Sequence, residues 1–233
     1  MVIHILEMMV ISVDIKFYFL RDLHSHKNKI MIVYEKIFNE EESDDIYNFL
    51  IEKDYEYHKP YMRFGKIVKV PRGQASYTLN KNIHYDYGIS GGSPINEVMC
   101  DRLKEITKKV NKVLSTNFNT ILYNIYKDGT DTIGWHKDKE KGWEIDTGVA
   151  TLSFGADRDF GIKEESTSIV KYILHQKGHV VYLPYPMNHN HLHGIPKRMK
   201  IKHPRISLTF REIVATIPQS SSPSSPPSSS PIK

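Results

Sequence analysis

The chain has 233 residues, 39% of them hydrophobic and 25% charged, which fits one globular domain with short extensions better than two domains. A formal charge of +5 and a pI near 9.0 favour a polyanionic partner over an acidic one. The single cysteine, Cys100, excludes an intramolecular disulfide and a thiolate zinc cluster, so we expect a reducing compartment inside the cell, either nucleus or cytoplasm.

The two ends of the chain differ from its centre. Residues 1–30 are predicted to be a strand-rich N-terminal extension, because Glu7, Asp14 and Lys16 interrupt the apolar run that a membrane span requires. The basic start of a secretory signal is missing too, and we expect no membrane association. Residues 216–233 are almost wholly Ser and Pro from Pro218 onward, which predicts a disordered tail.

Two helices are predicted before residue 119. The first follows Asn39, a capping residue, and it begins with three glutamates that suit the positive end of the helix dipole. The second is predicted to open at Ser93 and Pro94. Its apolar residues recur at three- and four-residue steps: Ile95, Val98, Met99, Leu103, Ile106, Val110 and Val113. Both helices are predicted to pack against the core and to carry no chemistry.

Strand patterns follow Asn119. Residues 121–126 alternate between two faces, and Lys127, Asp128 and Gly129 supply a turn. Further strand-like runs cover residues 149–154, 169–174, 179–183 and 205–211. Many short strands after a long helix predict an α+β protein with a β-sandwich or barrel core.

His136 and Asp138 are candidate metal ligands. Residues two apart in a strand share a face, so both side chains can reach one ion. With a distant histidine they would form the facial triad of non-haem iron(II) enzymes, which leaves positions open for a co-substrate and O₂. The third ligand is left open among six histidines: His175, His179, His189, His191, His193 and His203.

The alternation of His189, His191 and His193 permits two other interpretations. These three could form a zinc-binding face on one strand, or they could belong to a polar loop that happens to contain histidines. Spacing does not choose between these interpretations.

Residues 205–211 carry an apolar face and a polar face. The polar face offers Arg205, Arg211 and two hydroxyl groups, and the planar fork of arginine matches a carboxylate. This face is therefore a candidate site for a small dicarboxylate, the alternative being a solvent-facing strand side with paired arginines. Asn124 and Tyr126 share a face on their own strand and could complete that site, although a buried tyrosine is often simply core.

Together these residues resemble the AlkB family of Fe(II)- and 2-oxoglutarate-dependent dioxygenases. The resemblance spans roughly residues 64–213, and residues 63–66 and 70–75 bring it closest to the family member that repairs duplex DNA. The matching segments, in chain order, are Asn124-Ile125-Tyr126, Lys127-Asp128-Gly129, His136-x-Asp138, Ser153-Phe154-Gly155-Ala156, Asp159-Phe160, His193-Gly194-Ile195-Pro196, and Pro204 followed by residues 205–211.

The resemblance implies a role for each matching residue. It selects His193 as the third iron ligand beside His136 and Asp138. It implies that Arg205 and Arg211 bind 2-oxoglutarate, assisted by Asn124, Tyr126 and Thr209. The implied substrate-contacting residues are Phe64, Gly65, Lys66, Arg72, Tyr85, Tyr87, Lys139 and Glu140.

The resemblance also implies a fold and an activity. The fold is a double-stranded β-helix, or jelly roll, over residues 31–215, with flanking helices, a core at about 119–213 and a nucleotide-recognition lid at about 60–92. The activity is removal of N-alkyl groups from 1-methyladenine and 3-methylcytosine in DNA. It requires Fe(II), consumes 2-oxoglutarate and O₂, and releases formaldehyde, succinate and CO₂. The damaged base would be flipped out of the duplex, and we expect a monomeric enzyme.

Departures from the family pattern concern the substrate. Ser207 stands where members commonly carry asparagine, and Lys139 replaces an acid of the duplex-acting relative. The resemblance therefore does not determine which methylated base is preferred. The same chemistry on RNA or on a protein side chain is an alternative, and so is a non-catalytic nucleic-acid-binding module, although the intact triad and both arginines argue against the latter. Two basic clusters flank the candidate site in sequence: Lys59, Arg63, Lys66, Lys69 and Arg72, and Lys197, Arg198, Lys200 and Lys202.

Overall fold

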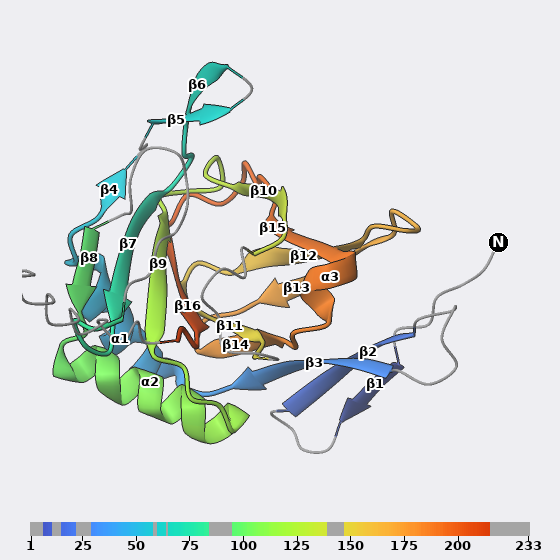
Figure 1. Ribbon diagram of the computed structural model, residues 1–233, viewed down its shortest axis with the longest axis horizontal. Helices are drawn as coiled ribbons and strands as arrows, with labels where there is room; N and C mark the ends of the chain where they lie inside the picture. Colours follow the sequence, from blue (N-terminus) through green and yellow to red (C-terminus); the bar gives the residue numbers. More distant parts are fainter. Residues whose placement is uncertain are drawn as a thin grey trace, which may run out of the picture.

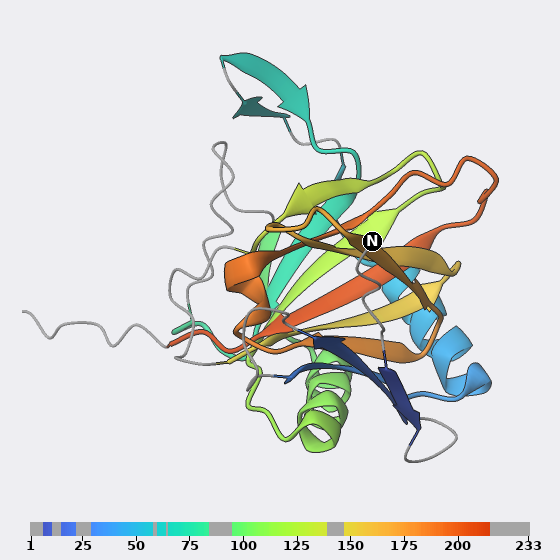
Figure 2. The same ribbon diagram turned by 90° about the vertical axis from the view of Figure 1, so that its right-hand side faces the viewer.

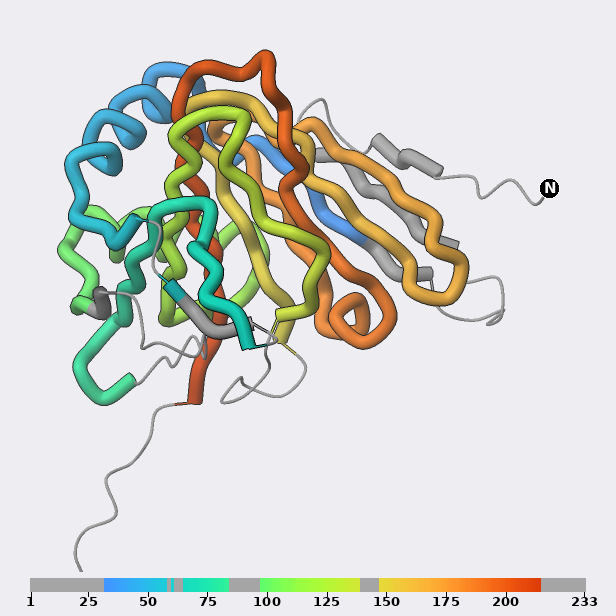
Figure 3. Tube along the Cα trace, turned by 90° about the horizontal axis from the view of Figure 1, so that it is seen from above, coloured from blue at the N-terminus to red at the C-terminus, as the bar shows by residue number. Residues whose placement is uncertain are grey.

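Two β-sheets face each other, and two helices cover the outer face of the larger sheet (Figures 1 and 3). The computed structural model describes residues 7–10, 15–21, 29–57, 60–63, 65–83, 95–138 and 147–214. Only the backbone is described before Ile32 and at residues 61–63, 95 and 96. The predicted Ser/Pro tail lies outside this part of the chain.

The larger sheet has β16 near its middle, between β11 and β9. Its strands lie in the order β1 (Glu7–Val10), β2 (Ile15–Arg21), β3 (Lys29–Lys36), β14 (His179–Leu183), β11 (Val149–Gly155), β16 (Arg205–Arg211), β9 (Thr120–Tyr126), β7 (Gly73–Thr78) and β4 (Glu56–Tyr57), with β8 (Ile95–Val98) parallel to β7. Because β16 has neighbours on both edges and layers on both faces, all seven of its residues are buried.

The smaller sheet carries strands β10 (Ile133–His136), β15 (His191–Ile195), β12 (Arg158–Glu164) and β13 (Val170–His175) in that order. A short helix, α3 (Met187–Asn190), leads into β15. The hairpin of β5 (Pro60–Arg63) and β6 (Lys66–Lys69) projects from the two sheets (Figures 1 and 2). Two facing, mainly antiparallel sheets confirm the jelly-roll fold that the resemblance implied.

Residue alternation separates two hydrophobic cores. Ile206, Leu208 and Phe210 of β16 pack into a core shared with helices α1 (Glu40–Ile51) and α2 (Asp101–Leu114). A second core, which includes Leu122 and Phe160, fills the space between the sheets. The apolar face of β16 therefore joins the helix layer, and its polar face is turned into the jelly roll.

The first predicted helix is confirmed, and the start of the second is wrong. Asn39 and Glu42 form a reciprocal cap at α1, in which each side chain accepts a backbone N–H at 2.9 Å. Residues 95–98, expected to be helical, instead pair with residues 75–78 of β7, and α2 begins at Asp101 after Cys100. The edge of β7 supplies backbone partners that outweigh local helical periodicity. Ser93 and Pro94 lie outside the described residues.

None of the helices in the described part of the chain has both the length and the apolar character that a membrane crossing needs.

Candidate metal centre

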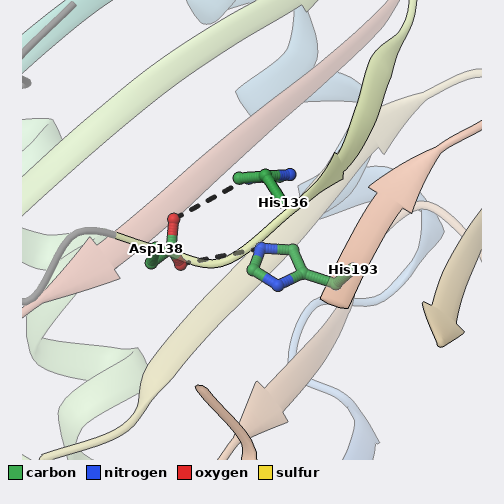
Figure 4. Close-up of side chains that lie close together, drawn as sticks. All are labelled: His136, Asp138 and His193. Atoms are coloured by element: carbon green, nitrogen blue, oxygen red, sulfur yellow. Dashed lines mark ion pairs between the residues drawn. The ribbon is translucent and has the colours of Figure 1, made fainter. Parts of the chain in front are cut away.

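His136, Asp138 and His193 converge on one point between the sheets (Figure 4). His136 of β10 lies opposite His193 of β15 in the antiparallel register. Asp138 Oδ1 is 3.9 Å from His136 Nε2, and Asp138 Oδ2 is 3.6 Å from His193 Nε2. One ligand atom from each residue lies within 4.8 Å of the other two, and among the described residues no other group of metal-ligating side chains meets this condition.

Asp138 reaches this point from a loop. The expectation that it shares a strand with His136 is wrong, because β10 ends at His136. The side chain of Asn188, in α3, holds the backbone of Asp138 instead. The Asp138 N–H donates to Asn188 Oδ1 at 2.8 Å, and Asn188 Nδ2 donates to the Asp138 carbonyl at 2.7 Å. The carboxylate is thus fixed relative to the helix that precedes the strand of His193.

The protonation states suit metal binding. His136 Nδ1 lies 2.9 Å from the Gly134 carbonyl, which can only accept, so Nε2 keeps its lone pair. Burial lowers the pKa of His136, and it lowers the pKa of His193 to about 3. Burial alone would raise the pKa of Asp138, but the charge of Arg211, joined at low pH by the two protonated histidines, holds it at about 2. Two neutral imidazoles and one carboxylate therefore face each other at neutral pH.

An orphaned carboxylate oxygen shows that these residues fit a metal ion. Oδ1 of Asp138 accepts from Arg211 Nη2 at 2.7 Å, whereas Oδ2 is buried without a hydrogen-bond partner. Leaving such an atom unsatisfied costs on the order of 1–3 kcal/mol, more for a charged group. A cation beside Oδ2 and the two Nε2 atoms removes that cost, and two imidazoles with one carboxylate are the donor set typical of non-haem iron(II).

A pocket of about 400 Å³, including space open to solvent, adjoins these three residues between the sheets. Small-molecule sites commonly measure roughly 300–1,000 Å³. Besides the metal-ligating group, the pocket is lined by residues of both sheets: Leu122, Asn124, Tyr126, Ile133, Thr151, Phe160, Gly194, Ile195, Arg205, Ser207, Thr209 and Arg211. The structure therefore brings the predicted dicarboxylate residues and the predicted metal ligands together.

Arg205 is a buried cation beside this pocket. It is 1% exposed, its Nε donates to Ser153 Oγ at 2.9 Å, and Nη2 donates to His175 Nδ1 at 3.2 Å. The guanidinium carbon lies 5.2 Å from the centre of the Tyr126 ring. Burial lowers the pKa of Arg205 to about 10, so the group remains charged at neutral pH. Nη1 has no hydrogen-bond partner, and no described carboxylate forms an ion pair with Arg205, so an anionic ligand would complete its surroundings.

Arg72, a substrate contact by the resemblance, is 5% exposed in this structure. Its Nε donates to Asn124 Oδ1 at 2.9 Å. Gln74 Nε2 donates to the same oxygen at 3.0 Å. Two donors on Oδ1 turn the amide nitrogen of Asn124 away from them. Arg72 is therefore a buried neighbour of the pocket residue Asn124, and its contact with substrate remains a prediction.

The other predicted residues separate into three groups. Thr209 lines the pocket, and its Oγ1 is 3.5 Å from that of Thr151. Gly65, with a φ of +73°, and the exposed Lys66 lie in the β5–β6 hairpin. Phe64, Tyr85, Tyr87, Lys139 and Glu140 lie outside the described residues.

The remaining histidines are dispersed. His189 is exposed on α3, His203 is exposed before β16, and His191 Nδ1 lies 2.6 Å from Asn190 Oδ1. His179 stacks on Tyr34 with ring centres 4.9 Å apart. The three-histidine zinc face is therefore not assembled among the described residues.

Asn188 and Ser153 support the site but had no role in the sequence interpretation, and His175 figured there only as one of six candidate third ligands. Asn188 occurs in a stretch rich in histidine and asparagine, which carries no spacing signal for it. Ser153 belongs to one of the matching segments, and that segment alone could have indicated it.

Comparisons with known proteins agree with this geometry. A family model described as the 2OG-Fe(II) oxygenase superfamily matches residues 30–211. The DNA oxidative demethylase ALKBH2 of Bos taurus is 33% identical over 196 residues, which cover 78% of this chain and 69% of that protein. The alpha-ketoglutarate-dependent dioxygenase alkB homolog 3 of Mus musculus is 26% identical over 180 residues, covering 70% and 55%. The solved structure entitled "The structure of OsALKBH1" has a TM-score of 0.55 at 14% identity, covering 78% of this chain and 97% of that one, and this likeness concerns the fold alone.

Proposed function

This chain belongs to the 2OG-Fe(II) oxygenase superfamily, and from that premise we propose that it demethylates N-alkylated bases in DNA, with 1-methyladenine and 3-methylcytosine as substrates. The products would be the restored base, formaldehyde, succinate and CO₂. The superfamily makes the protein a 2-oxoglutarate-dependent dioxygenase that uses Fe(II) and O₂, as the resemblance implied.

The observation that carries the proposal is the position of a buried cation and a metal-ligating group in one pocket. His136, Asp138 and His193 would hold the iron, and Arg205 would bind a carboxylate of 2-oxoglutarate. When bound, the metal and its co-substrates supply the oxidation of an N-methyl C–H bond. The protein holds the ligands in their metal-binding protonation states.

Arg205 and Arg211 would bind different parts of the co-substrate. They stand six residues apart on one extended strand, roughly 20 Å between Cα atoms, and both side chains line the same pocket. Arg211 contacts the metal-ligating Asp138, so Arg205 lies at the end remote from the metal. A dicarboxylate with one end at the metal would therefore place its other carboxylate at Arg205.

Two features support a nucleic-acid substrate. The relatives at 33% identity are DNA oxidative demethylases by name, and the chain carries a formal charge of +5. Exposed lysines occur in both basic clusters, at Lys66 and Lys69 of the hairpin and at Lys197, Lys200 and Lys202 before β16. Such lysines suit contacts with phosphates on either side of a flipped base. A methylated base that has lost its pairing costs less free energy to flip out of the duplex.

Incubation of the purified protein with Fe(II) and oligonucleotides that contain 1-methyladenine or 3-methylcytosine tests the proposal. We expect formaldehyde release and repaired base only when 2-oxoglutarate is present. Matched RNA oligonucleotides and methylated peptides form the other arms. Turnover confined to RNA or peptide would replace the proposed substrate, and succinate formation without turnover of any arm would leave only the oxygenase assignment standing.

A further inference from the structure

A third histidine, outside the metal-ligating group, contacts the pocket residue Arg205. His175, on β13, is fully buried, and its Nδ1 atom is 3.2 Å from Nη2 of Arg205. β13 belongs to the smaller sheet and β16 to the larger one. The contact therefore joins the two sheets at the guanidinium that faces the pocket.

The hydrogen bonds of His175 define one tautomer. An arginine N–H can only donate, so Nδ1 of His175 must accept. Nε2 must then carry the ring proton, and it lies 2.9 Å from the carbonyl oxygen of His179. A protonated imidazole would lose the acceptor and would set a second positive charge against Arg205. Burial and the charge of Arg205 both lower the pKa of His175 well below its ordinary value, in agreement with this geometry.

The carbonyl that accepts the hydrogen bond from Nε2 of His175 is itself held in place by a turn. Gly178, with a φ of +74°, lets the chain reverse between β13 and β14, and its N–H donates to the Ser153 carbonyl at 2.8 Å. The side chain of Ser153 accepts from Nε of Arg205 at 2.9 Å. Ser153 Oγ and His175 Nδ1, two neutral acceptors of Arg205, thus both belong to residues attached to the β13–β14 turn.

We infer that His175 is a positioning residue for Arg205: its neutral imidazole orients the guanidinium so that Nη1 faces the pocket, without neutralising the charge that a carboxylate ligand needs. An aspartate or glutamate at this position would hold the arginine equally well, but it would form an ion pair that neutralises the charge of the arginine. A neutral acceptor leaves the full positive charge of Arg205 available, so His175 should strengthen binding of the dicarboxylate co-substrate. The inference rests on the proposed role of Arg205 as the 2-oxoglutarate site.

Three variants of the full-length enzyme separate positioning from packing. His175→Leu fills similar space without an acceptor, and His175→Asn keeps an oxygen near the position of Nδ1. His203→Leu makes the same change at an exposed histidine two residues before Arg205. Each variant is measured for 2-oxoglutarate binding by calorimetry on the Mn(II)-loaded protein, for KM and kcat, and for thermal unfolding.

We expect His175→Leu to weaken 2-oxoglutarate binding and raise its KM about tenfold or more, the scale for losing a hydrogen bond to a charged group. kcat at saturating 2-oxoglutarate and the KM for the methylated oligonucleotide should change less than about twofold, a split that reflects lost ground-state binding. His175→Asn should recover most of the affinity, and His203→Leu should match the unmodified enzyme. Unchanged 2-oxoglutarate affinity in folded His175→Leu, or equal losses in the Leu and Asn variants, overturns the inference.

Nitrogen NMR of the unmodified protein gives a test that needs no variant. His175 should be neutral with the proton on Nε2 between pH 6 and 8, and its Nδ1 resonance should shift when 2-oxoglutarate is added to the Mg(II)-loaded protein. A proton on Nδ1, or a charged ring, contradicts the inference. If the unmodified protein binds no 2-oxoglutarate in calorimetry, the proposed function fails; if it binds and His175→Leu binds equally, only the inference fails.

Discussion

Nη2 of Arg211 donates to Oδ1 of Asp138 across 2.7 Å, with both side chains almost fully buried. This contact joins the last residue of β16 to the metal-ligating group. Oδ1 is thereby engaged by the arginine, and Oδ2 lies 3.6 Å from Nε2 of His193 without a hydrogen-bond partner. The polar face of β16 and the metal-ligating group are consequently one structural unit.

Removal of any one metal ligand should abolish turnover. His136→Ala, Asp138→Ala and His193→Ala each take away a donor from a three-ligand site, and we expect no detectable formaldehyde with little change in the circular dichroism spectrum. His191→Ala is the control, because His191 lies two residues away on the same strand and outside the group. An active His193→Ala together with an inactive His191→Ala would make our ligand assignment wrong.

Arg205 and Arg211 should differ when their charge is removed. Arg205→Ala should chiefly weaken 2-oxoglutarate binding, by roughly 1.5–3 kcal/mol or on the order of tenfold to a hundredfold, because a charge-assisted hydrogen bond is lost. Arg211→Ala should also weaken Mn(II) binding, since Asp138 loses its hydrogen-bonded cation. Titrations of 2-oxoglutarate and of Mn(II) measure the two effects separately. An unchanged 2-oxoglutarate requirement in Arg205→Ala would count against the site.

Arg72 and Lys66 should give opposite results in salt titrations. Arg72→Met removes a buried donor to Asn124, so we expect a raised KM for 2-oxoglutarate and an unchanged salt dependence of oligonucleotide binding. Lys66→Met removes an exposed charge, and the slope of log affinity against log salt should flatten by about 0.7–0.9, as for one lost phosphate contact. A flattened slope in Arg72→Met would instead support its interpretation as a phosphate contact.

The buried His175 should make stability depend on pH. Its folded-state pKa lies well below the ordinary value of about 6.5, so below that pH the unfolded chain binds a proton that the folded protein does not. The free energy of unfolding is therefore lost as pH falls, by up to about 1.4 kcal/mol per pH unit for one group. The free energy of unfolding, measured with denaturant, should fall more steeply between pH 6.5 and 5 for the unmodified protein than for His175→Asn. Parallel curves would show that His175 is charged in the folded protein.

Phe64 should matter more for duplex than for single-stranded substrates. The residue lies outside the described part of the chain, next to the hairpin glycine Gly65, and the prediction comes from the resemblance. An aromatic ring that fills the gap left by a flipped base contributes about 1–3 kcal/mol, and a single strand has no such gap. We expect Phe64→Ala to lower repair of methylated duplexes at least roughly fivefold more than repair of single strands. Equal losses would recast Phe64 as a packing residue.

Local patterns in the sequence were sufficient for the elements whose signal is local. The alternation in residues 205–211 predicted the bounds of β16 and the separation of its two faces. The cap at Asn39 predicted the start of α1 in the same way, because a cap involves only the first turn of a helix. β12, in contrast, was not predicted: its residues 158–164 mix charges with Gly161, and they form a strand because β13 and β15 pair with both of its edges.

Pairing between distant segments also decided the second helix and the site. Periodicity extended that helix back to Ser93, whereas residues 95–98 belong to β8 beside β7. For the metal centre, the sequence supplied the donor types and left six histidines open as the third ligand, among which only the family resemblance selected His193. The antiparallel register of β10 and β15 sets His193 opposite His136, and Asn188 brings in Asp138 from a loop. Spacing along a chain fixes which face a side chain occupies, but convergence on one ion depends on which strands pair and in what register, and the tertiary fold alone determines that.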